Sequence, residues 1–404
     1  MKKYINRGME AVLKRAVTRF PAVMLTGPRQ SGKTTLLKRL FAKSRRYVSF
    51  DAADIRMAAL ADPRGFLEEH APPLILDEVQ YVPEILPYIK EDIDEHRSSP
   101  GRYILSGSQN LSLMAHATES LAGRVAILKL MPLSLRELTG RTFAPLVWEG
   151  TAPSGNVMPR SALWKRLLDG WYPEPASGRP ADVQLWHTSY VSTYLERDVR
   201  TARNIGDLTQ FQSFLRALAA RCAQLLNITD LARDLGVAPN TVRGWLSVLE
   251  ATYQVYIVRP YHTNIGKRLV KTPKVFFTDT GVLCHLTGIQ APDQLAQGPT
   301  AGAVFEAAVL GEIIKTMRNR GEEPAIYFWR TSNGTEVDIV IESRGKLIPL
   351  EVKLSQTPKP SMAYGINRFR EIYGVRAAPG YVVHPGKMRL PLGPGVTAIP
   401  FCDL

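Results

Sequence analysis

The segment that most constrains this chain is residues 27–34, which read GPRQSGKT. An apolar run, AVMLT at 22–26, comes directly before it, and apolar residues at helical spacing follow over 36–41. A strand, the pattern GxxxxGK(S/T) and a helix in this order are typical of a P-loop, whose glycines let backbone amides wrap an anion. The pattern therefore predicts an α/β domain that binds the phosphates of a nucleoside triphosphate.

The positions of this loop carry expected roles in holding the nucleotide. Lys33 would neutralise charge on the β- and γ-phosphates, and Thr34 would offer its hydroxyl to Mg²⁺. The following helix would add the positive end of its dipole. No NKxD-type motif for reading guanine is evident, which favours ATP. The expected nucleotide-binding set is Gly27, Pro28, Arg29, Gln30, Ser31, Gly32, Lys33, Thr34 and Thr35.

A second motif, LILDE at 74–78, reads as a buried strand that ends in two carboxylates. Asp77 would hold Mg²⁺, directly or through water, and Glu78 would orient and deprotonate the attacking water. Acidic pairs after apolar strands are also common surface caps, so this interpretation depends on the P-loop upstream. Together the two motifs predict an ATPase whose cofactors are ATP and Mg²⁺.

Five segments of the chain resemble a large bacterial and archaeal family of AAA+-like P-loop ATPases. They read GPRQSGKTT, LILDEVQ, ILSGSQN, SLAGR and MPLSLRE. The similarity extends over nearly the whole chain, and members of the family carry a C-terminal region known as a domain of unknown function. The resemblance implies an AAA+-like ATPase fold for residues 1–140 and a homo-oligomer such as a ring, although a monomeric switch stays open.

In such ATPases a polar residue at the end of the third strand senses the γ-phosphate. Residues 102–109 end in Ser106, Ser108 and Gln109, and Ser108 is the first candidate for this role. The same residues would also fit an ordinary loop that follows a strand and has no role in sensing nucleotide. Arg124, at the end of SLAGR, would be either an arginine finger for a neighbouring subunit or a structural or solvated arginine.

Charge and cysteine content indicate the partners and the compartment. The 404 residues include 51 basic and 37 acidic side chains, a formal net charge of +14 that attracts polyanions such as nucleic acid. The alternative is charge that serves solubility alone. The three cysteines are far apart, which favours a reducing compartment and no zinc site or disulfide. We expect a cytoplasmic protein with no membrane partner, because neither a signal peptide nor a run of about 18 apolar residues is evident.

Residues 227–250 read as two short helices with a turn at Gly236, which is a helix-turn-helix. Two β-rich pieces follow, at 253–258 and 274–277, with a basic loop between them. This order predicts a winged helix-turn-helix, which serves either to bind DNA or to pack as a lid of the ATPase. In the DNA-binding version, the first turn of the second helix would read the major groove and the loop would lie on phosphates. The candidate DNA contacts are Asn240, Thr241, Arg243, Lys267, Arg268 and Lys271.

The C-terminal hundred residues carry a second set of acids. Asp338 lies in a predicted strand, twelve residues separate it from Glu351, and Glu351-Val-Lys353 completes a D…ExK pattern. In the restriction-endonuclease-like, or PD-(D/E)xK, fold this pattern brings Asp338 and Glu351 to one Mg²⁺, with Lys353 beside the attacked phosphate. Glu306, on a preceding helix, would supply an outer carboxylate. The rival interpretation is a buried cluster of ion pairs with a structural role.

These features predict four parts: an AAA+-like P-loop ATPase domain (1–140), a linker and helical region (141–222), a winged helix-turn-helix (223–292) and a nuclease-like α/β domain (293–404). The leading hypothesis is an ATP-driven motor or switch that engages DNA and carries a metal-dependent nuclease. The alternatives are a nucleotide-gated regulatory or assembly protein with a non-catalytic C-terminal scaffold, and a chaperone-like ATPase. The candidate catalytic set is Lys33, Glu78, Ser108, Arg124, Asp338, Glu351 and Lys353.

Overall fold

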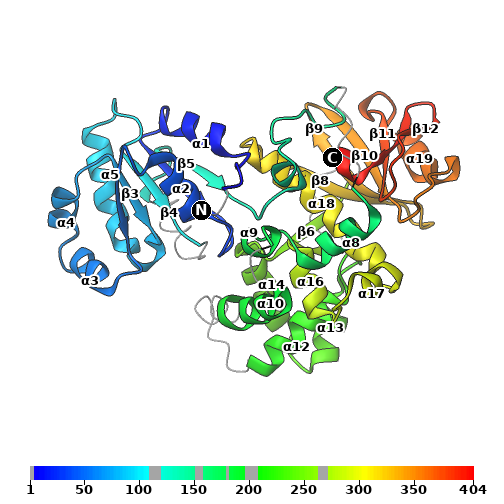
Figure 1. Cartoon of the computed structure of the whole chain (residues 1–404), viewed down its shortest axis with the longest axis horizontal. Coiled ribbons are helices and arrows are strands. Elements are labelled where there is room, and N and C mark those ends of the chain that lie inside the picture. The colour runs from blue at the N-terminus through cyan, green and yellow to red at the C-terminus, as the bar shows by residue number, and fades with distance from the viewer. Residues whose placement is uncertain (1–3, 109–119, 151–157, 179–181, 196–207, 263–271) are drawn as a thin grey trace.

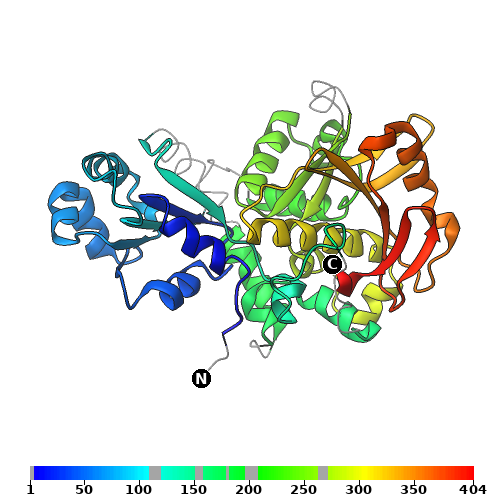
Figure 2. The same ribbon diagram turned by 90° about the horizontal axis from the view of Figure 1, so that it is seen from above.

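The structure is a computed structural model, and it describes residues 4–108, 120–150, 158–178, 182–195, 208–262 and 272–404. Figure 1 shows an N-terminal α/β lobe in blue and cyan and a second lobe that holds the middle and the end of the chain. Figure 2 shows the same two lobes from above, with the C-terminal strands on the outer side of the second lobe. The long helix α18 (Ala301–Asn319) contacts strands of both lobes.

The N-terminal lobe is built on a parallel sheet with the strand order β2-β3-β4-β1-β5. The apolar runs that the sequence predicts as strands are the buried strands β1 and β3, and β4 lies between them. Because parallel strands share one carboxyl edge, the residues that follow β1, β3 and β4 lie at the same edge of the sheet. The strands are β1 (Ala22–Thr26), β2 (Arg46–Ser49), β3 (Leu74–Asp77), β4 (Tyr103–Ser106) and β5 (Val125–Lys129).

Helices cover both faces of this sheet, since successive side chains of a buried strand point to opposite sides. Ala22 and Met24 of β1 pack in one cluster with residues of α4 and α5. Val23 and Leu25 pack on the other face with residues of α1 and α2. The elements are α1 (Glu10–Val17), α2 (Lys33–Phe41), α3 (Ala53–Ala61), α4 (Pro63–Glu69), α5 (Leu86–Glu95) and the 3₁₀ turns η1 (Val79–Tyr81) and η2 (Pro83–Ile85).

The middle of the chain is helical, and its helix-turn-helix segment forms as its pattern predicts. The Asn227 side chain accepts hydrogen bonds from the amides of Thr229 and Asp230 at 3.0 and 3.3 Å, which starts α13. Gly236, with a φ of 65°, ends that helix in the left-handed conformation that favours glycine. The elements are α7 (Leu135–Leu138), α8 (Arg160–Asp169), α9 (Pro173–Ala176), α10 (Val183–Tyr190), the π-helical turn η3 (Val191–Leu195), α12 (Leu208–Ala219), α13 (Ile228–Leu235), α14 (Pro239–Ala251), α16 (Thr280–Leu286) and α17 (Pro292–Gln297).

The second lobe contains a mixed sheet with the order β12-β13-β11-β10-β9-β8-β6-β7. The hairpin β6-β7, which follows the helix-turn-helix, joins this sheet through parallel pairing of β6 with β8. The hairpin and the C-terminal strands therefore form one sheet across the predicted boundary at residue 292. The elements are β6 (Val255–Pro260), β7 (Lys274–Phe277), β8 (Ile326–Arg330), β9 (Glu336–Ser343), β10 (Lys346–Val352), β11 (Gly380–His384), β12 (Leu390–Gly393), β13 (Val396–Pro400), α19 (Tyr364–Tyr373) and the 3₁₀ turns η4 (Pro360–Ala363), η5 (Gly374–Arg376) and η6 (Phe401–Asp403).

A large hydrophobic core joins the middle of the chain to the C-terminal strands in the second lobe. It includes Trp164 of α8, Trp245 of α14, Phe305 of α18 and Ile341 of β9. Because helices of the middle region and strands of the C-terminal region share this core, they support each other's packing. No helix among the described residues is long and apolar enough to cross a membrane.

Candidate functional site

The P-loop follows β1 and leads into α2 as the sequence predicts. Gly27 has a φ of 142°, and a Cβ at this position would lie 2.1 Å from the carbonyl oxygen of Leu130, so the loop start requires glycine. Gly32, with a φ of 94°, precedes Lys33 at the start of α2. The ammonium of Lys33 donates to the carbonyls of Gly27 and Pro28, each at 3.0 Å. The lysine thus points into the concave side of its own loop.

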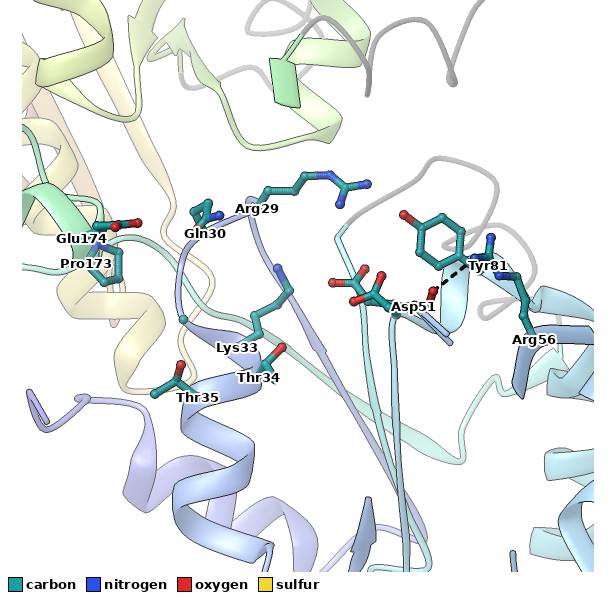
Figure 3. Close-up of a pocket in the computed structure, with 12 residues that line it drawn as sticks. Arg29, Gln30, Lys33, Thr34, Thr35, Asp51, Arg56, Tyr81, Pro173 and Glu174 are labelled. Atoms are coloured by element: carbon teal, nitrogen blue, oxygen red, sulfur yellow. Dashed lines mark hydrogen bonds between the residues drawn. The ribbon is translucent and has the colours of Figure 1, made fainter. Parts of the chain in front are cut away.

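A pocket of about 630 Å³ opens in front of this loop (Figure 3). Six of the nine residues in the predicted nucleotide-binding set line it, and Gly27, Pro28 and Ser31 are buried behind them. One wall of the pocket comes from the N-terminal lobe and the opposite wall from α9 of the middle region, with Lys33 and Thr34 between them. The residues of the two walls beyond the loop are Asp51, Arg56, Glu78 and Tyr81 on one side and Pro173 and Glu174 on the other.

Asp77 ends β3 directly beside the P-loop. Its Oδ2 accepts hydrogen bonds from the hydroxyls of Thr34 at 2.7 Å and Tyr47 at 2.6 Å. Its Oδ1 accepts from the hydroxyl of Ser106, at the end of β4. Burial and the hydrogen bond to Asp77 raise the pKa of Tyr47, so this phenol stays a donor. The structure therefore brings the predicted Thr34 and Asp77 together and adds Tyr47, which the sequence analysis missed.

Glu78 follows Asp77 in an unusual backbone conformation. Its φ and ψ are 57° and 42°, in the left-handed region, which costs a non-glycine residue about 1 kcal/mol. The turn directs its side chain to the pocket, and the 3₁₀ turn η1 follows at once. Gln80, on that turn, donates from Nε2 to the Glu78 carboxylate and to the Ser108 hydroxyl at 3.3 Å. The predicted base and the predicted sensor are thus joined through a glutamine.

Arg124 lies away from the nucleotide pocket of its own chain. It immediately precedes β5, and the strand register pairs Val125 with Ala22 at the amino end of β1, while the P-loop follows the carboxyl end of β1. Its guanidinium holds both carboxylate oxygens of Asp94, at 2.7 and 3.0 Å, and this hydrogen-bonded pair raises the pKa of the arginine. Arg124 is predicted to be either a structural arginine or an arginine finger for a neighbouring subunit, and neither role is tested by this geometry.

Arg7 contacts the P-loop from behind, and the sequence analysis gave it no role. Its guanidinium donates to the carbonyl of Ser31 at 2.7 Å, to the carbonyl of Met131 at 2.6 Å and to the carboxylate of Glu137 at 2.9 Å. Each of these contacts is buried. A single arginine therefore ties the phosphate-binding loop to the segment that leaves β5.

The C-terminal acids also lie close together. Register places Leu350 of β10 opposite Ile339 of β9, so the next residues, Glu351 and Asp338, are neighbours. Asp338 Oδ2 accepts a hydrogen bond from the amide of Val352 at 2.8 Å, and Lys353 Nζ lies 2.8 Å from Glu351 Oε2. Burial, with the adjacent Asp338 carboxylate, raises the pKa of Glu351 well above its usual range. The predicted D…ExK residues are thus assembled with Lys353 paired to Glu351.

A second lysine enters this cluster from outside the predicted motif. Lys274, at the start of β7, lies 3.5 Å from Glu306 Oε1 and forms an ion pair with Glu336. Burial opposes the charge of Lys274, but the carboxylates of Glu306 and Glu336 outweigh it and raise the pKa of the lysine. Burial and the Asp338 carboxylate raise the pKa of Glu306 to about 8. The sequence could not reveal this contact, because β7 lies far from the acids along the chain.

No group of three or more His, Cys, Asp and Glu side chains within the described part of the chain is arranged to hold a metal ion. The C-terminal acids instead face two ammonium groups, from Lys274 and Lys353. The predicted metal roles of Glu306, Asp338 and Glu351 therefore stay predictions. All three cysteines are free thiols, with Cys222 and Cys284 buried.

The predicted DNA contacts fall in two groups. Asn240 and Arg243 are exposed on the first turn of α14, where the Arg243 guanidinium donates to the Asn240 side-chain oxygen at 2.8 Å. Thr241 is partly exposed beside them. The second group, Lys267, Arg268 and Lys271, lies outside the described residues, as does Gln109.

Fold and site together define a P-loop domain of the AAA class, and the comparisons agree. Residues 19–139 match the profile of the AAA domain, residues 301–404 a domain of unknown function (DUF4143) and residues 160–293 another (DUF8612). The first two matches confirm the resemblance that the sequence motifs indicated.

The chain belongs to the same family as two uncharacterized mycobacterial proteins, Rv2008c of Mycobacterium tuberculosis and Mb2031c of Mycobacterium bovis. Each is 33% identical to it over 399 residues, covering 98% of this chain and 83% of the relative. Among solved structures, a Walker-type ATPase of Pyrococcus abyssi is similar over 70% of this chain and 96% of its own, with 17% identity and a TM-score of 0.41. AMPPCP-bound DnaA of Aquifex aeolicus is similar over 59% of this chain and 86% of its own, with 13% identity and a TM-score of 0.30.

Proposed function

We propose that this protein binds ATP with Mg²⁺ in the pocket of residues 27–35 and hydrolyses it. The observation that carries the proposal is the hydrogen bond between Thr34 and Asp77, which joins the P-loop to the end of β3. A hydroxyl and a carboxylate side by side are the oxygen donors that Mg²⁺ prefers. Thr34 and Asp77 would hold the ion, which would neutralise phosphate charge when bound.

The other residues of the site bind the phosphates, activate the attacking water or sense the γ-phosphate. Backbone amides of the loop and the Lys33 ammonium bind the phosphates, since both present positive charge to the concave side of the loop. Glu78 lines the pocket next to Asp77 and orients and deprotonates the attacking water. Ser108 contacts the γ-phosphate from the end of β4, as a sensor.

Steady-state turnover and nucleotide binding, measured together, test this proposal. Lys33→Ala is expected to lose ATP binding, and Glu78→Gln is expected to keep binding while turnover falls at least about 100-fold, the usual contribution of a general base. Exposed Lys359, outside the site, supplies the control Lys359→Ala. Wild-type turnover in Glu78→Gln would show that Glu78 is not the base.

For the C-terminal domain, we propose a scaffold rather than a nuclease. The specific observation is that Lys274 and Lys353 pair with Glu306 and Glu351, two of the three carboxylates predicted to hold a metal. Plasmid DNA with Mg²⁺ or Mn²⁺ is therefore expected to stay intact with wild type and with Asp338→Ala alike. Nicking by wild type that disappears in Asp338→Ala would restore the nuclease hypothesis.

The scaffold proposal also predicts a stability effect of Lys274. Replacing the buried Lys274 by Met leaves the half-buried Glu306 and Glu336 without their partner, which we expect to cost about 3 kcal/mol in the free energy of unfolding. Adding Glu336→Gln to Lys274→Met removes the carboxylate of this ion pair and should recover part of the loss. Urea unfolding measures both, with Lys359→Met as the exposed control. A loss below about 1 kcal/mol for Lys274→Met would contradict a structural role for this ion pair.

DNA engagement by α14 is a second proposed function, and it would make the protein a DNA-responsive ATPase. It is supported by the exposed Asn240 and Arg243 on a first turn without acidic residues and by the net charge of +14. Duplex or single-stranded DNA is expected to stimulate ATP turnover several-fold in wild type and less in Arg243→Ala. Turnover that does not change over a wide range of DNA concentrations would argue for the nucleotide-gated assembly protein instead.

A homo-oligomer in which Arg124 serves the pocket of a neighbour is also part of the proposal. It is supported by the distance of Arg124 from its own P-loop along the sheet. Such a finger predicts that Arg124→Ala binds ATP as wild type does but hydrolyses it slowly. Wild-type turnover in Arg124→Ala would leave this residue only its ion pair with Asp94.

A further inference from the structure

Gln80 joins the two polar groups of the nucleotide site that come from different strands. Glu78 follows β3 and Ser108 follows β4, and the Gln80 side-chain amide donates to both. The orientation of that amide is fixed chemically, because a carboxylate only accepts hydrogen bonds and an oxygen facing it would be repelled. Both N–H groups of Gln80 are therefore committed to the site. Its Oε1 is buried and finds no hydrogen-bond partner within the described part of the chain.

Ser106 and Ser108 each connect to one of the two acids at the end of β3, Asp77 and Glu78. Ser106 is the last residue of β4, and Ser108 follows it two residues later. Ser106 donates directly to Asp77, the residue expected to hold the metal. Ser108 reaches the next acid, Glu78, only through Gln80. Each carboxylate of the site is thus held by a polar group of the neighbouring strand, one directly and one through the glutamine.

The hydrogen bonds also set the direction in which the Ser108 hydroxyl donates. Since its oxygen accepts from Gln80, the hydroxyl hydrogen points away from the glutamine. A sensor must present that hydrogen to a phosphate oxygen, which is an acceptor. The side chain of Gln80 itself stays out of the pocket, whose lining includes Glu78 and the neighbouring Tyr81. It can therefore act on the reaction only through the residues that it holds.

We propose that Gln80 is a positioning residue of the ATPase site, which aims the Glu78 carboxylate and orients the Ser108 hydroxyl. This inference rests on the proposed function and adds to it a residue that touches neither substrate nor metal. The hydrogen bond that Gln80 donates fixes the direction of the Glu78 carboxylate. Removing the donor lowers the rate of hydrolysis without changing the groups that bind phosphate.

The test compares Gln80→Leu with wild type in ATP turnover and in binding of a non-hydrolysable ATP analogue. We expect kcat to fall about tenfold, because a general base that is not aimed at the attacking water loses part of its contribution. The dissociation constant of the analogue is expected to change less than about threefold, because the loop and Lys33 are untouched. Gln224→Leu, at an exposed glutamine on the second lobe, is the matched control and keeps both wild-type values.

Gln80→Glu is the second variant, and Glu78→Gln is the reference that tests the proposed function itself. Gln80→Glu keeps the shape of the side chain but sets a carboxylate against that of Glu78, so kcat should fall at least as far as in Gln80→Leu while binding of the analogue changes less than about threefold. If Gln80→Leu does not fold, as judged by circular dichroism, Gln80→Glu alone decides the question. Wild-type kcat in the folded Gln80 variants would overturn the inference while Glu78→Gln still lacks turnover. Turnover in Glu78→Gln would instead overturn the proposed function.

Discussion

At the scale of single residues, Lys315 on α18 is a cationic side chain inside the second lobe. Its side chain is almost fully buried, and its ammonium lies 4.5 Å from the centre of the Trp171 ring. Burial lowers its pKa to about 8, although the carboxylates of Glu312, Asp279 and Glu137 favour its charge and Arg7 opposes it. The folded protein therefore releases this proton at a lower pH than the unfolded chain does.

The shifted pKa of Lys315 predicts a pH-dependent stability difference. Below pH 8 both states carry the charge, and between about pH 8 and 10.5 only the unfolded chain does, so this group makes stability rise with pH. Relative to Lys315→Met, wild type should gain of the order of 1–2 kcal/mol between pH 8 and 9.5. Urea unfolding of the two proteins at several pH values measures the difference, in which titrating groups far from Lys315 cancel. A constant difference over this range would show that the lysine titrates normally.

The sequence predicted the residues of the nucleotide site whose spacing is itself the signal. Gly27, Lys33, Thr34 and the acids after β3 follow fixed intervals along the chain, and the structure brings them to one edge of a sheet. Tyr47 could not be found in this way, because its contact with Asp77 depends on which strand lies beside β3. Gln80 lies in LILDEVQ, one of the segments that resemble the ATPase family. Its role follows only from its hydrogen-bond partners, which the sequence does not show.

At the scale of elements, the short helix α7 explains why MPLSLRE reads as a motif. The Ser134 side chain accepts a hydrogen bond from the Glu137 amide at 3.1 Å, and the Glu137 carboxylate accepts from the Ser134 amide at 2.7 Å, which is a capping box. The next two amides, of Leu135 and Arg136, donate to Glu312 of α18 at 2.7 and 3.2 Å. The start of α7 is thus held by its own serine and by a carboxylate of α18.

Removing the N-cap of α7 is expected to lower the free energy of unfolding. Ser134→Ala removes the acceptor for the buried Glu137 amide, and N-cap replacements of this kind cost about 0.5–2 kcal/mol. We expect a loss of about 1 kcal/mol by urea unfolding, with Ser134→Thr close to wild type because threonine can also cap. The exposed Ser177 gives the control Ser177→Ala, which should stay within about 0.5 kcal/mol. Equal losses for Ser134→Ala and Ser177→Ala would contradict this role for the cap.

Elements were easier to predict than their pairing. The strands over 274–277 and around 336–341 and the helices over 227–250 follow from alternation, helical spacing and the glycine turn, and all of them form. The parallel pairing of β6 with β8 joins segments about seventy residues apart and leaves no local pattern. For the same reason the sequence indicated the C-terminal acids but not Lys274, which the hairpin brings to them.

At the scale of the whole molecule, buried polar contacts connect the P-loop to the second lobe. Arg7 binds the carbonyl of Ser31 in the loop and the carboxylate of Glu137 on α7. The first amides of α7 in turn donate to Glu312 on α18, one turn of helix before Lys315. A shift of the P-loop on binding nucleotide would therefore act on α18 through groups that are hydrogen-bonded at each step, and low dielectric surroundings strengthen such contacts.

This connection predicts that ATP binding changes the second lobe and that Arg7 carries part of the effect. In wild type, a non-hydrolysable ATP analogue is expected to alter hydrogen exchange of the amides in α18 as well as in the P-loop. Arg7→Met should keep the change in the P-loop, at saturating analogue, and lose most of the change in α18. Arg64→Met removes an exposed arginine of the same lobe and should behave as wild type in both regions. Because coupling is reciprocal, Glu312→Gln should also alter the affinity for the analogue. An unaltered response of α18 in Arg7→Met, together with an unaltered affinity in Glu312→Gln, would show that the two lobes respond to nucleotide independently.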